Sequence, residues 1–392
     1  MSTLNLYPNE NATFADKVNG LQNGDTLLVH HGVYPVTPKP PEQFPESPLG
    51  AACAIKGKED IRIVGFGNPI VQLTEHGDGL LIDGCKNVNV EGVTFQGAGV
   101  IRRPENKISY AMIQLYRDNA RLAVKDCCFF DSGNHGIAQL WGPRGTSQSI
   151  FEGNVFARGG NYGRESLVAD GAALAVGGNR NVFRNNHITD WLRGIEIENP
   201  FPASGSEHCV IERNLIERCT WQSILVTPDG VPADRMFEQF RGIQICNNTI
   251  VGTTVRSEAI SNCGIYVSGG LGFRIQDNHI SRIADGIGIL LQSDHGDIRD
   301  SLIAGNMIED TDRTGIQFST GVGGSVSQNV FHGNILRRIK GRGIAGEGTL
   351  NLVSLNQVFG CDYEPYYGLK KKQTTQWISN EWNDCKLWPN YG

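Results

Sequence analysis

Residues 182–199, with the sequence VFRNNHITDWLRGIEIEN, contain the pattern that decides the fold. An alternating apolar-polar strand ends at Asn186, a very short strand follows around Ile188, and a second alternating strand, GIEIE, closes the stretch. The same order of features recurs in residues 209–226, 243–267, 273–290 and 301–318. The asparagines that mark the repeat lie 22–34 residues apart; they are Asn154, Asn186, Asn214, Asn248, Asn278, Asn306, Asn334 and Asn356. One such unit cannot bury its apolar side alone, so the repeats must stack on one another.

Strands of three to five residues with period-2 alternation in every repeat predict a parallel stack of coils. Asparagine suits the turns because it tolerates the left-handed backbone region, and its amide can bond the asparagine one coil away. We therefore predict one domain over residues 1–392. It would have a short helical cap at 12–25, coils at 26–360 and an aromatic-rich capping tail at 361–392.

The asparagine series, the G-I-x-I strands and the opening NGDTLLVHHGVY (23–34) resemble the right-handed parallel β-helix proteins of the pectate-lyase-like superfamily. The resemblance covers roughly residues 12–360 and implies an all-β, single-stranded right-handed β-helix. It leaves the function open, because that superfamily includes lyases, hydrolases, esterases, epimerases, phage tailspikes and non-catalytic modules. Side-by-side trimers are common among such proteins, so the resemblance also suggests a homotrimer.

Composition excludes several classes of partner. The net charge of −6 and the sequence pI of about 5.9 argue against nucleic acid and against an anionic membrane surface as partners. No apolar run reaches the ~20 residues of a membrane span, and the first residues do not resemble a signal peptide. The ten cysteines are scattered without a C-x-x-C pair. We expect a reduced, cytoplasmic protein, or a secreted one if a leader has been lost from its start.

In β-helix proteins of this kind the strand after the asparagine turn usually lines the substrate groove. Alternation predicts which of its side chains point outward. The predicted sugar-binding positions on these strands are Gln114, Tyr116, Gln139, Trp141 and Tyr266. Aromatic rings can stack on sugar rings, and amides can bond hydroxyl groups, so an oligo- or polysaccharide is the expected partner.

Glu196 and Glu198 lie on one face of one predicted strand, and two nearby carboxylates can divide the roles of acid and base. Asp170, one coil earlier, and Arg193, just before the strand, complete the predicted catalytic set. The alternative interpretation is an exposed polar strand face, with Asp170 serving a turn. The separation of the two carboxyl groups, which would distinguish retention from inversion, is not readable from the sequence.

Asp294 and His295 begin the sequence DHGD (294–297), directly after another groove strand, and are further candidates for substrate binding. An imidazole between carboxylates can move protons near neutral pH, although the same residues can form a polar turn.

The sequence predicts a carbohydrate-active enzyme that cleaves or rearranges glycosidic bonds without a cofactor. One alternative is a polysaccharide lyase or uronate epimerase, for which Ca²⁺ could be needed. The other is a non-catalytic glycan-binding or structural β-helix.

Overall fold

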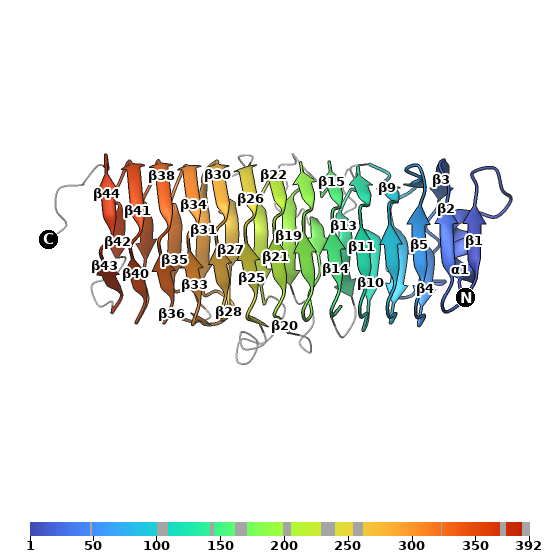
Figure 1. Ribbon diagram of the computed structural model, residues 1–392, viewed down its shortest axis with the longest axis horizontal. Helices are drawn as coiled ribbons and strands as arrows, with labels where there is room; N and C mark the ends of the chain where they lie inside the picture. The colour runs from blue at the N-terminus through green and yellow to red at the C-terminus, as the bar shows by residue number, and fades with distance from the viewer. Residues whose placement is uncertain are drawn as a thin grey trace. The chain divides into compact units, whose positions relative to one another are not determined.

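Each repeat of the sequence forms one coil of three short strands in this computed structural model, and the coils stack through parallel pairing. The structure describes residues 1–47, 49–99, 109–141, 145–160, 171–198, 205–228, 240–253, 262–322, 324–368 and 374–385. The chain divides into two compact units, residues 1–196 and 197–392. In both units the strands belong to three parallel sheets, which we name sheets I, II and III in chain order (Figure 1).

In the first unit, sheet I contains β1 (Thr3–Leu6), β2 (Thr26–Val29), β5 (Arg62–Gly65), β8 (Asn89–Glu91), β11 (Ala123–Lys125), β14 (Ile150–Glu152) and β17 (Val182–Arg184). Sheet II contains β3 (Val33–Val36), β6 (Ile70–Leu73), β9 (Thr94–Gln96), β12 (Cys128–Phe130), β15 (Val155–Ala157) and β18 (His187–Thr189). Sheet III contains β4 (Ala51–Lys56), β7 (Asp78–Asp83), β10 (Ala111–Tyr116), β13 (His135–Trp141), β16 (Ala172–Ala175) and β19 (Arg193–Glu198), which runs past residue 196.

In the second unit, sheet I contains β21 (Val210–Glu212), β25 (Gln244–Cys246), β29 (Arg274–Gln276), β33 (Leu302–Ala304), β37 (Val330–His332), β40 (Leu352–Ser354) and β43 (Gln376–Ile378). Sheet II contains β22 (Leu215–Cys219), β26 (Thr249–Thr253), β30 (His279–Ile283), β34 (Met307–Thr311), β38 (Ile335–Ile339), β41 (Gln357–Cys361) and β44 (Glu381–Asn383). Sheet III contains β23 (Gln222–Thr227), β27 (Asn262–Val267), β31 (Gly286–Gln292), β35 (Ile316–Ser319), β39 (Ile344–Gly346) and β42 (Tyr366–Gly368). A short fourth sheet contains β20 (Ser206–Glu207), β24 (Phe240–Arg241), β28 (Gly270–Leu271), β32 (Ile298–Arg299) and β36 (Val326–Ser327).

The predicted N-terminal helix is α1 (Phe14–Gly20), at the N-terminal end of the first unit (Figure 1). Thr13 and Asp16 form a capping box, in which each side chain accepts the backbone N–H of the other residue. Phe14 and Val18 are buried on the face that packs toward β4. Strand β1 precedes the helix and pairs with β2. Within the described residues, no helix is long and apolar enough to cross a membrane.

The predicted asparagine ladder is confirmed. In the second unit Asn248, Asn278 and Asn306 each donate a side-chain hydrogen bond to the next asparagine, at 2.9–3.0 Å. Each amide nitrogen also donates to a backbone carbonyl of the preceding coil, so that each buried NH₂ group makes two hydrogen bonds. The left-handed backbone conformation belongs to the residue before the ladder position, for example Asp277 with φ 55°. The ladder position therefore needs an amide, whereas the position before it needs a residue that tolerates positive φ.

The ladder continues one step beyond Asn356, the last asparagine counted in the sequence analysis. Asn356 donates to Asn380 at 3.0 Å, and β43 and β44 pair in register with β40 and β41. Residues 374–385 of the aromatic-rich tail thus form strands of a further coil. In this coil Trp377 and Trp382 pack against the ring of Tyr366.

Inside each unit the inward side chains stack in rows of the same kind. In the first unit Phe95, Phe129 and Phe156 stack with ring centroids 5.4 and 4.7 Å apart. In the second unit Ile245, Ile275 and Ile303 occupy equivalent positions of consecutive strands and are fully buried. Such rows bury apolar surface between neighbouring coils, which is the main stabilising contribution in a stacked fold.

Candidate functional site

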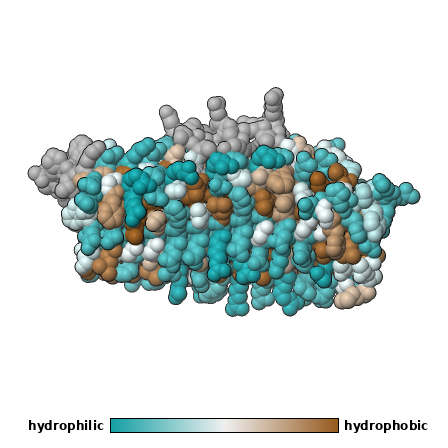
Figure 2. All heavy atoms as spheres, turned by 45° about the horizontal axis from the view of Figure 1, so that its top comes forward, coloured by the Kyte–Doolittle hydropathy of each residue, from teal (hydrophilic) through white to brown (hydrophobic). Residues whose placement is uncertain are grey.

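The outward face of sheet III carries most of the residues that the sequence analysis singled out. In the first unit, the inward row contains Ile113, Ile137, Leu174 and Ile195. The outward row beside it contains Gln114, Ala138, Ala175 and Glu196, in register from one strand to the next. Figure 2 shows one face of the molecule coloured by hydropathy; hydrophilic residues predominate on it, with smaller hydrophobic areas between them.

Glu196 and Arg193 form an ion pair on this face. The Arg193 guanidinium donates from Nη1 to Glu196 Oε1 at 2.7 Å; the side chain of Glu196 is 2% exposed and that of Arg193 is 14% exposed. Glu196 itself is 1% exposed, whereas the sequence analysis expected it to line an open groove. Glu198, two residues further along β19, is partly exposed. Asp170, the third predicted carboxylate, lies outside the described residues.

The two amide positions of the first unit also differ from the expectation of an open groove. Gln114 is fully buried and donates from Nε2 to the backbone carbonyl of Leu115 at 3.1 Å. Gln139 is 8% exposed, and its side-chain oxygen accepts the backbone N–H of Thr146 at 2.8 Å. Ala138, not Gln139, lies beside Gln114, and the register shifts only after this pair, so that Trp141 lies beside Tyr116. Alternation predicts the face to which a side chain points, but not what packs over that face.

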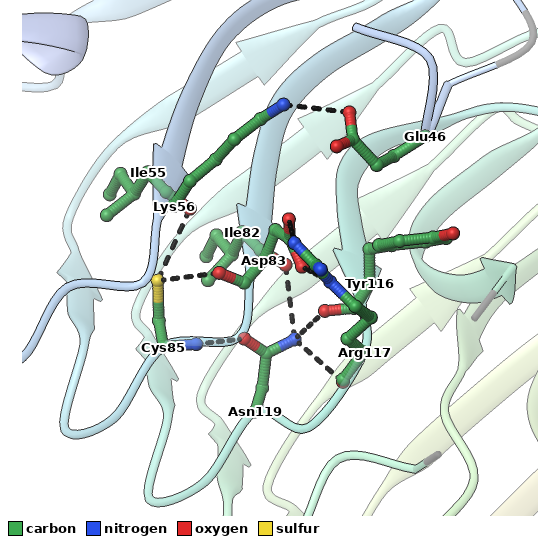
Figure 3. A network of polar contacts seen from close by, with 9 residues as sticks. All are labelled: Glu46, Ile55, Lys56, Ile82, Asp83, Cys85, Tyr116, Arg117 and Asn119. Atoms are coloured by element: carbon green, nitrogen blue, oxygen red, sulfur yellow. Dashed lines mark hydrogen bonds and ion pairs between the residues drawn. The ribbon is translucent and has the colours of Figure 1, made fainter. Parts of the chain in front are cut away.

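Tyr116 and Trp141, both predicted as sugar-binding positions, lie beside each other at the ends of β10 and β13. Tyr116 is partly exposed; the side chain of Trp141 lies outside the described residues. Tyr116 adjoins the polar network in Figure 3, where Arg117 makes a bidentate ion pair with the buried Asp83. In the same network Lys56 donates to Glu46 at 2.7 Å.

Two buried groups at the start of sheet III strands were not proposed as site residues from the sequence. Asp78 accepts the backbone N–H of Ala111 at 2.7 Å, and burial raises its pKa from 3.8 to about 7. His135 accepts the backbone N–H of Ala172 on Nδ1 at 3.0 Å. Both side chains thus bond the first backbone N–H of the following strand. The contact of His135 thus holds one strand of sheet III against the next.

The second unit brings predicted residues together. Tyr266, on β27, donates its hydroxyl hydrogen to Asp294 Oδ2 at 2.7 Å. Gln292, at the end of β31, donates from Nε2 to the same carboxylate at 2.8 and 2.9 Å. Tyr266, Gln292 and Asp294 all remain partly exposed. The backbone N–H of His295 donates to the carbonyl of Ser268 at 2.9 Å, which holds this segment against the preceding coil.

A second carboxylate, that of Glu347, lies directly after β39, on the far side of β35 from β31. Ser319 pairs with Gln292, and the backbone N–H of Glu347 donates to Phe318 at 2.9 Å, so Glu347 is two coils from Gln292. Glu347 accepts the hydroxyl hydrogen of Thr320, and Gly321 donates its N–H to Ser293 at 2.9 Å. Sequence reasoning placed Glu347 on the outward face but did not single it out. We name Tyr266, Gln292, Asp294, Thr320 and Glu347 the polar shelf.

Metal binding was considered for the lyase alternative. Among the residues that the structure describes, no group of three or more histidine, cysteine, aspartate or glutamate side chains is arranged to hold a metal ion. The calcium requirement of the lyase alternative stays a prediction.

Comparison with known families agrees with this architecture. The family described as "Right handed beta helix region" matches residues 78–234 and 233–370, which together make up most of the chain. The chain belongs to the right-handed β-helix family. The match begins at β7 and ends after β42, so it includes the polar shelf.

Solved structures share the fold at low sequence identity. An exopolygalacturonase from Thermotoga maritima is 11% identical, with a TM-score of 0.56 and coverage of 91% of this chain and 84% of that one. The catalytic unit of a GH87 α-1,3-glucanase from Streptomyces thermodiastaticus is 12% identical, with a TM-score of 0.58 and coverage of 97% and 70%. PfbA, a surface adhesin of Streptococcus pneumoniae, is 10% identical, with a TM-score of 0.56 and coverage of 95% and 87%. No curated protein matches the sequence significantly.

Proposed function

We propose that the chain is a carbohydrate-active protein that binds an oligo- or polysaccharide at the polar shelf and cleaves its glycosidic bonds by carboxylate acid/base chemistry. The observation that carries the proposal is the geometry of Asp294. Three hydrogen bonds from Tyr266 and Gln292 orient its carboxylate, and the side chain still reaches solvent. A carboxylate that is oriented by donors but remains accessible can act on a bound ligand.

We assign the second carboxylate that glycoside hydrolysis requires to Glu347, which is 8% exposed and thus less accessible than Asp294. Two strand spacings, roughly 9–10 Å between backbones, separate Gln292 from Glu347, and Asp294 lies two residues beyond Gln292. Inverting glycosidases hold their two carboxyl groups ~6.5–9.5 Å apart, with a water molecule between them, whereas retaining enzymes need ~5–5.5 Å. Two carboxylates carried on strands two coils apart leave room for that water molecule, so we propose an inverting reaction. In that reaction one carboxyl group protonates the leaving oxygen and the other activates water.

Tyr266 gives the shelf a surface for a sugar ring. Its ring packs beside Leu290 and Ile287 on the outward face of sheet III, and its hydroxyl is held by Asp294. Two of the similar structures are named as a polygalacturonase and a glucanase, and the third as an adhesin. These names support a glycan as ligand for this chain, and the shelf supplies the aromatic and polar groups that a glycan needs.

The proposal can be tested with Asp294→Asn and Glu347→Gln. A panel of poly- and oligosaccharides is first screened for binding and for the release of new reducing ends. On the glycan that reacts, each variant should lose at least about 100-fold in kcat while Kd stays within about threefold. NMR of the first product should show inversion at the anomeric carbon.

Asp300→Asn is the matched control. Asp300 is an exposed aspartate with φ 58° in the turn between β32 and β33, and asparagine tolerates that conformation. The control should bind and react like the unmodified protein. The proposal fails if Asp294→Asn and Glu347→Gln both keep full turnover, or if no glycan of the panel binds.

A non-catalytic glycan-binding protein is the second candidate. The observation that favours it is the burial of Glu196 in an ion pair with Arg193, because this carboxylate was the sequence-based candidate for catalysis. For a purely binding protein, Tyr266→Ala should weaken glycan binding about tenfold with no turnover in any variant. Glu196→Gln should then leave binding unchanged, since a buried ion pair serves the fold.

A further inference from the structure

Cys361 and Cys385 occupy equivalent positions in consecutive coils of the second unit. Strands β41 and β44 pair in parallel register, with Val358 beside Trp382 and Phe359 beside Asn383. The next residues, Gly360 and Asp384, both have the left-handed conformation, with φ of 65° and 54°. One coil earlier, Arg338 has the same conformation and the following residue, Ile339, pairs with Cys361. By the same register Cys385 lies beside Cys361.

This placement suits a covalent bond between the two sulfur atoms. Register neighbours in a parallel sheet have Cα atoms ~4.8 Å apart, within the ~4.4–6.8 Å that disulfides span. Both residues are free thiols, Cys361 buried and Cys385 partly exposed. The sulfur of Cys385 points back toward the Cys361 strand, because it donates to the carbonyl of Val358 at 3.7 Å. Burial raises the pKa of the Cys361 thiol, and the neighbouring Cys385 raises it further.

Two other cysteines that lie in paired strands, Cys246 and Cys263, have residues other than cysteine beside them in the neighbouring strands. Cys246, which is also partly exposed, pairs with Glu212 on one side and Gln276 on the other. Cys263 pairs with Gln222 and Ile287. The register thus places no cysteine beside Cys246 or Cys263, whereas it places Cys385 beside Cys361.

We infer that Cys361 and Cys385 are a thiol pair that low-molecular-weight disulfides, such as oxidised glutathione, convert to an internal disulfide. The partly exposed Cys385 thiolate attacks one glutathione sulfur, which breaks the glutathione disulfide and releases one glutathione thiol. The Cys361 thiolate then attacks the Cys385 sulfur and releases the second glutathione thiol. Two protein thiols and one glutathione disulfide thus give one protein disulfide and two glutathione thiols.

The bond would fasten the last described coil to the coil before it. This coil is weakly covered, since Trp382 is 52% exposed and Ile378 is 48% exposed. It is also linked to the preceding coil by the side chain of Tyr366, which donates to the carbonyls of Asn356 and Glu381 at 2.8 and 2.9 Å. A disulfide across residues 361–385 restricts the unfolded chain, so oxidation should raise the resistance of this end to local unfolding.

Peptide mapping of the full chain tests the inference. The reduced protein is treated with oxidised glutathione at about pH 8.5, remaining thiols are alkylated, and the protein is digested with trypsin without reduction. The sequence predicts that residues 343–370 and residues 373–386 are released as single peptides that contain Cys361 and Cys385 respectively. We expect them joined, two hydrogens lighter than their sum, and we expect a slower reaction at pH 7 because a thiolate must form.

Cys246→Ser is the control and should leave the joined peptide unchanged, while Cys385→Ser should abolish it and leave Cys361 open to alkylation. The oxidised protein should also release residues 373–386 more slowly under brief native-state proteolysis. Recovery of the two peptides separately, each alkylated or carrying glutathione, would overturn the inference. A Cys361 peptide joined to any other cysteine peptide of the folded protein would overturn it as well.

Discussion

The outward face of sheet III differs between the two units, although the same alternation places the side chains there. In the first unit Asp78, Gln114 and Glu196 are at most 2% exposed. In the second unit Tyr266, Gln292 and Asp294 keep part of their surface in solvent. A buried carboxylate must be compensated by the fold around it, whereas a partly exposed one can exchange water for a ligand. The comparison predicts that substitution of the buried Glu196 affects stability, whereas substitution of the partly exposed Asp294 affects function.

The largest effect is expected from the ionisation of Asp78. Burial raises its pKa to about 7 in the folded chain, while the unfolded carboxyl ionises near its ordinary value of 3.8. Between about pH 4 and pH 7 the folded state therefore binds the additional proton, and the free energy of unfolding falls as pH rises. The contribution is full below about pH 4 and is lost by about pH 7, a total of about 4 kcal/mol. Urea denaturation of the unmodified protein and of Asp78→Asn at several pH values measures the difference.

The Asp78 prediction concerns the pH dependence of that difference and not the absolute stability of either protein. Asp78→Asn should become more stable relative to the unmodified protein as pH rises from 4.5 to 7.5. A difference that stays constant across this range would show that Asp78 is ionised in the folded state, and the contrast between the units would weaken.

Glu196→Gln should destabilise the first unit by about 3 kcal/mol. The substitution replaces the charged acceptor of the Arg193 guanidinium with a neutral one, at a place where the side chain of Glu196 is 2% exposed and that of Arg193 is 14% exposed. The free energy of unfolding from chemical denaturation measures the loss. The double variant Arg193→Met with Glu196→Gln should recover part of it, since it removes both members of the ion pair. If Glu196→Gln unfolded at the same denaturant concentration as the unmodified protein, the ion pair would have to be accessible to water.

Tyr266→Phe should cost about 1 kcal/mol in the second unit. The substitution removes one hydrogen bond to Asp294 and leaves the ring in place. The same measurement of unfolding applies, with glycan affinity measured in parallel. A loss above about 2 kcal/mol would mean that the polar shelf supports the fold as strongly as the buried groups of the first unit do.

Asp294→Asn should lower the free energy of unfolding by at most about 1 kcal/mol. Its side chain is partly exposed, and an asparagine keeps one oxygen that can accept from Tyr266 or Gln292, so that only part of the hydrogen bonding is lost. Asp300→Asn is the matched comparison at an exposed turn and should change the free energy of unfolding by less than about 0.5 kcal/mol. If Asp294→Asn were instead as destabilising as Glu196→Gln, the proposed division between a structural and a functional carboxylate would be refuted.

Much of the architecture could be predicted from the sequence because the repeat is local. Asn186, Asn214 and their counterparts mark every coil, and the apolar residues of each strand alternate with a period of two. Asn380 was missed because the step from Asn356 crosses residues 361–373, whose composition differs from that of the other coils. The helix α1 lies within the cap expected at residues 12–25, and the apolar residues at helical spacing there, Phe14, Val18 and Leu21, are buried.

The candidate site was predicted only in part. The sequence analysis selected Tyr266 and Asp294 separately, from alternation and from the DHGD sequence, and the structure shows that they are hydrogen-bonded across one coil. It did not single out Glu347, because the residue's relation to Asp294 depends on which strand ends are neighbours. It also expected Gln114 and Glu196 to line a groove, because alternation contains no information about burial on the outward side.

The sequence by itself determined the stack of coils, its asparagine ladder and the face to which each strand residue points. These follow from backbone geometry and from a repeat that recurs every 22–34 residues. Only the tertiary structure decided which outward carboxylates are enclosed and which reach solvent. Ionisation and ligand access depend on the groups packed around a side chain, and these come from neighbouring coils that are distant in sequence.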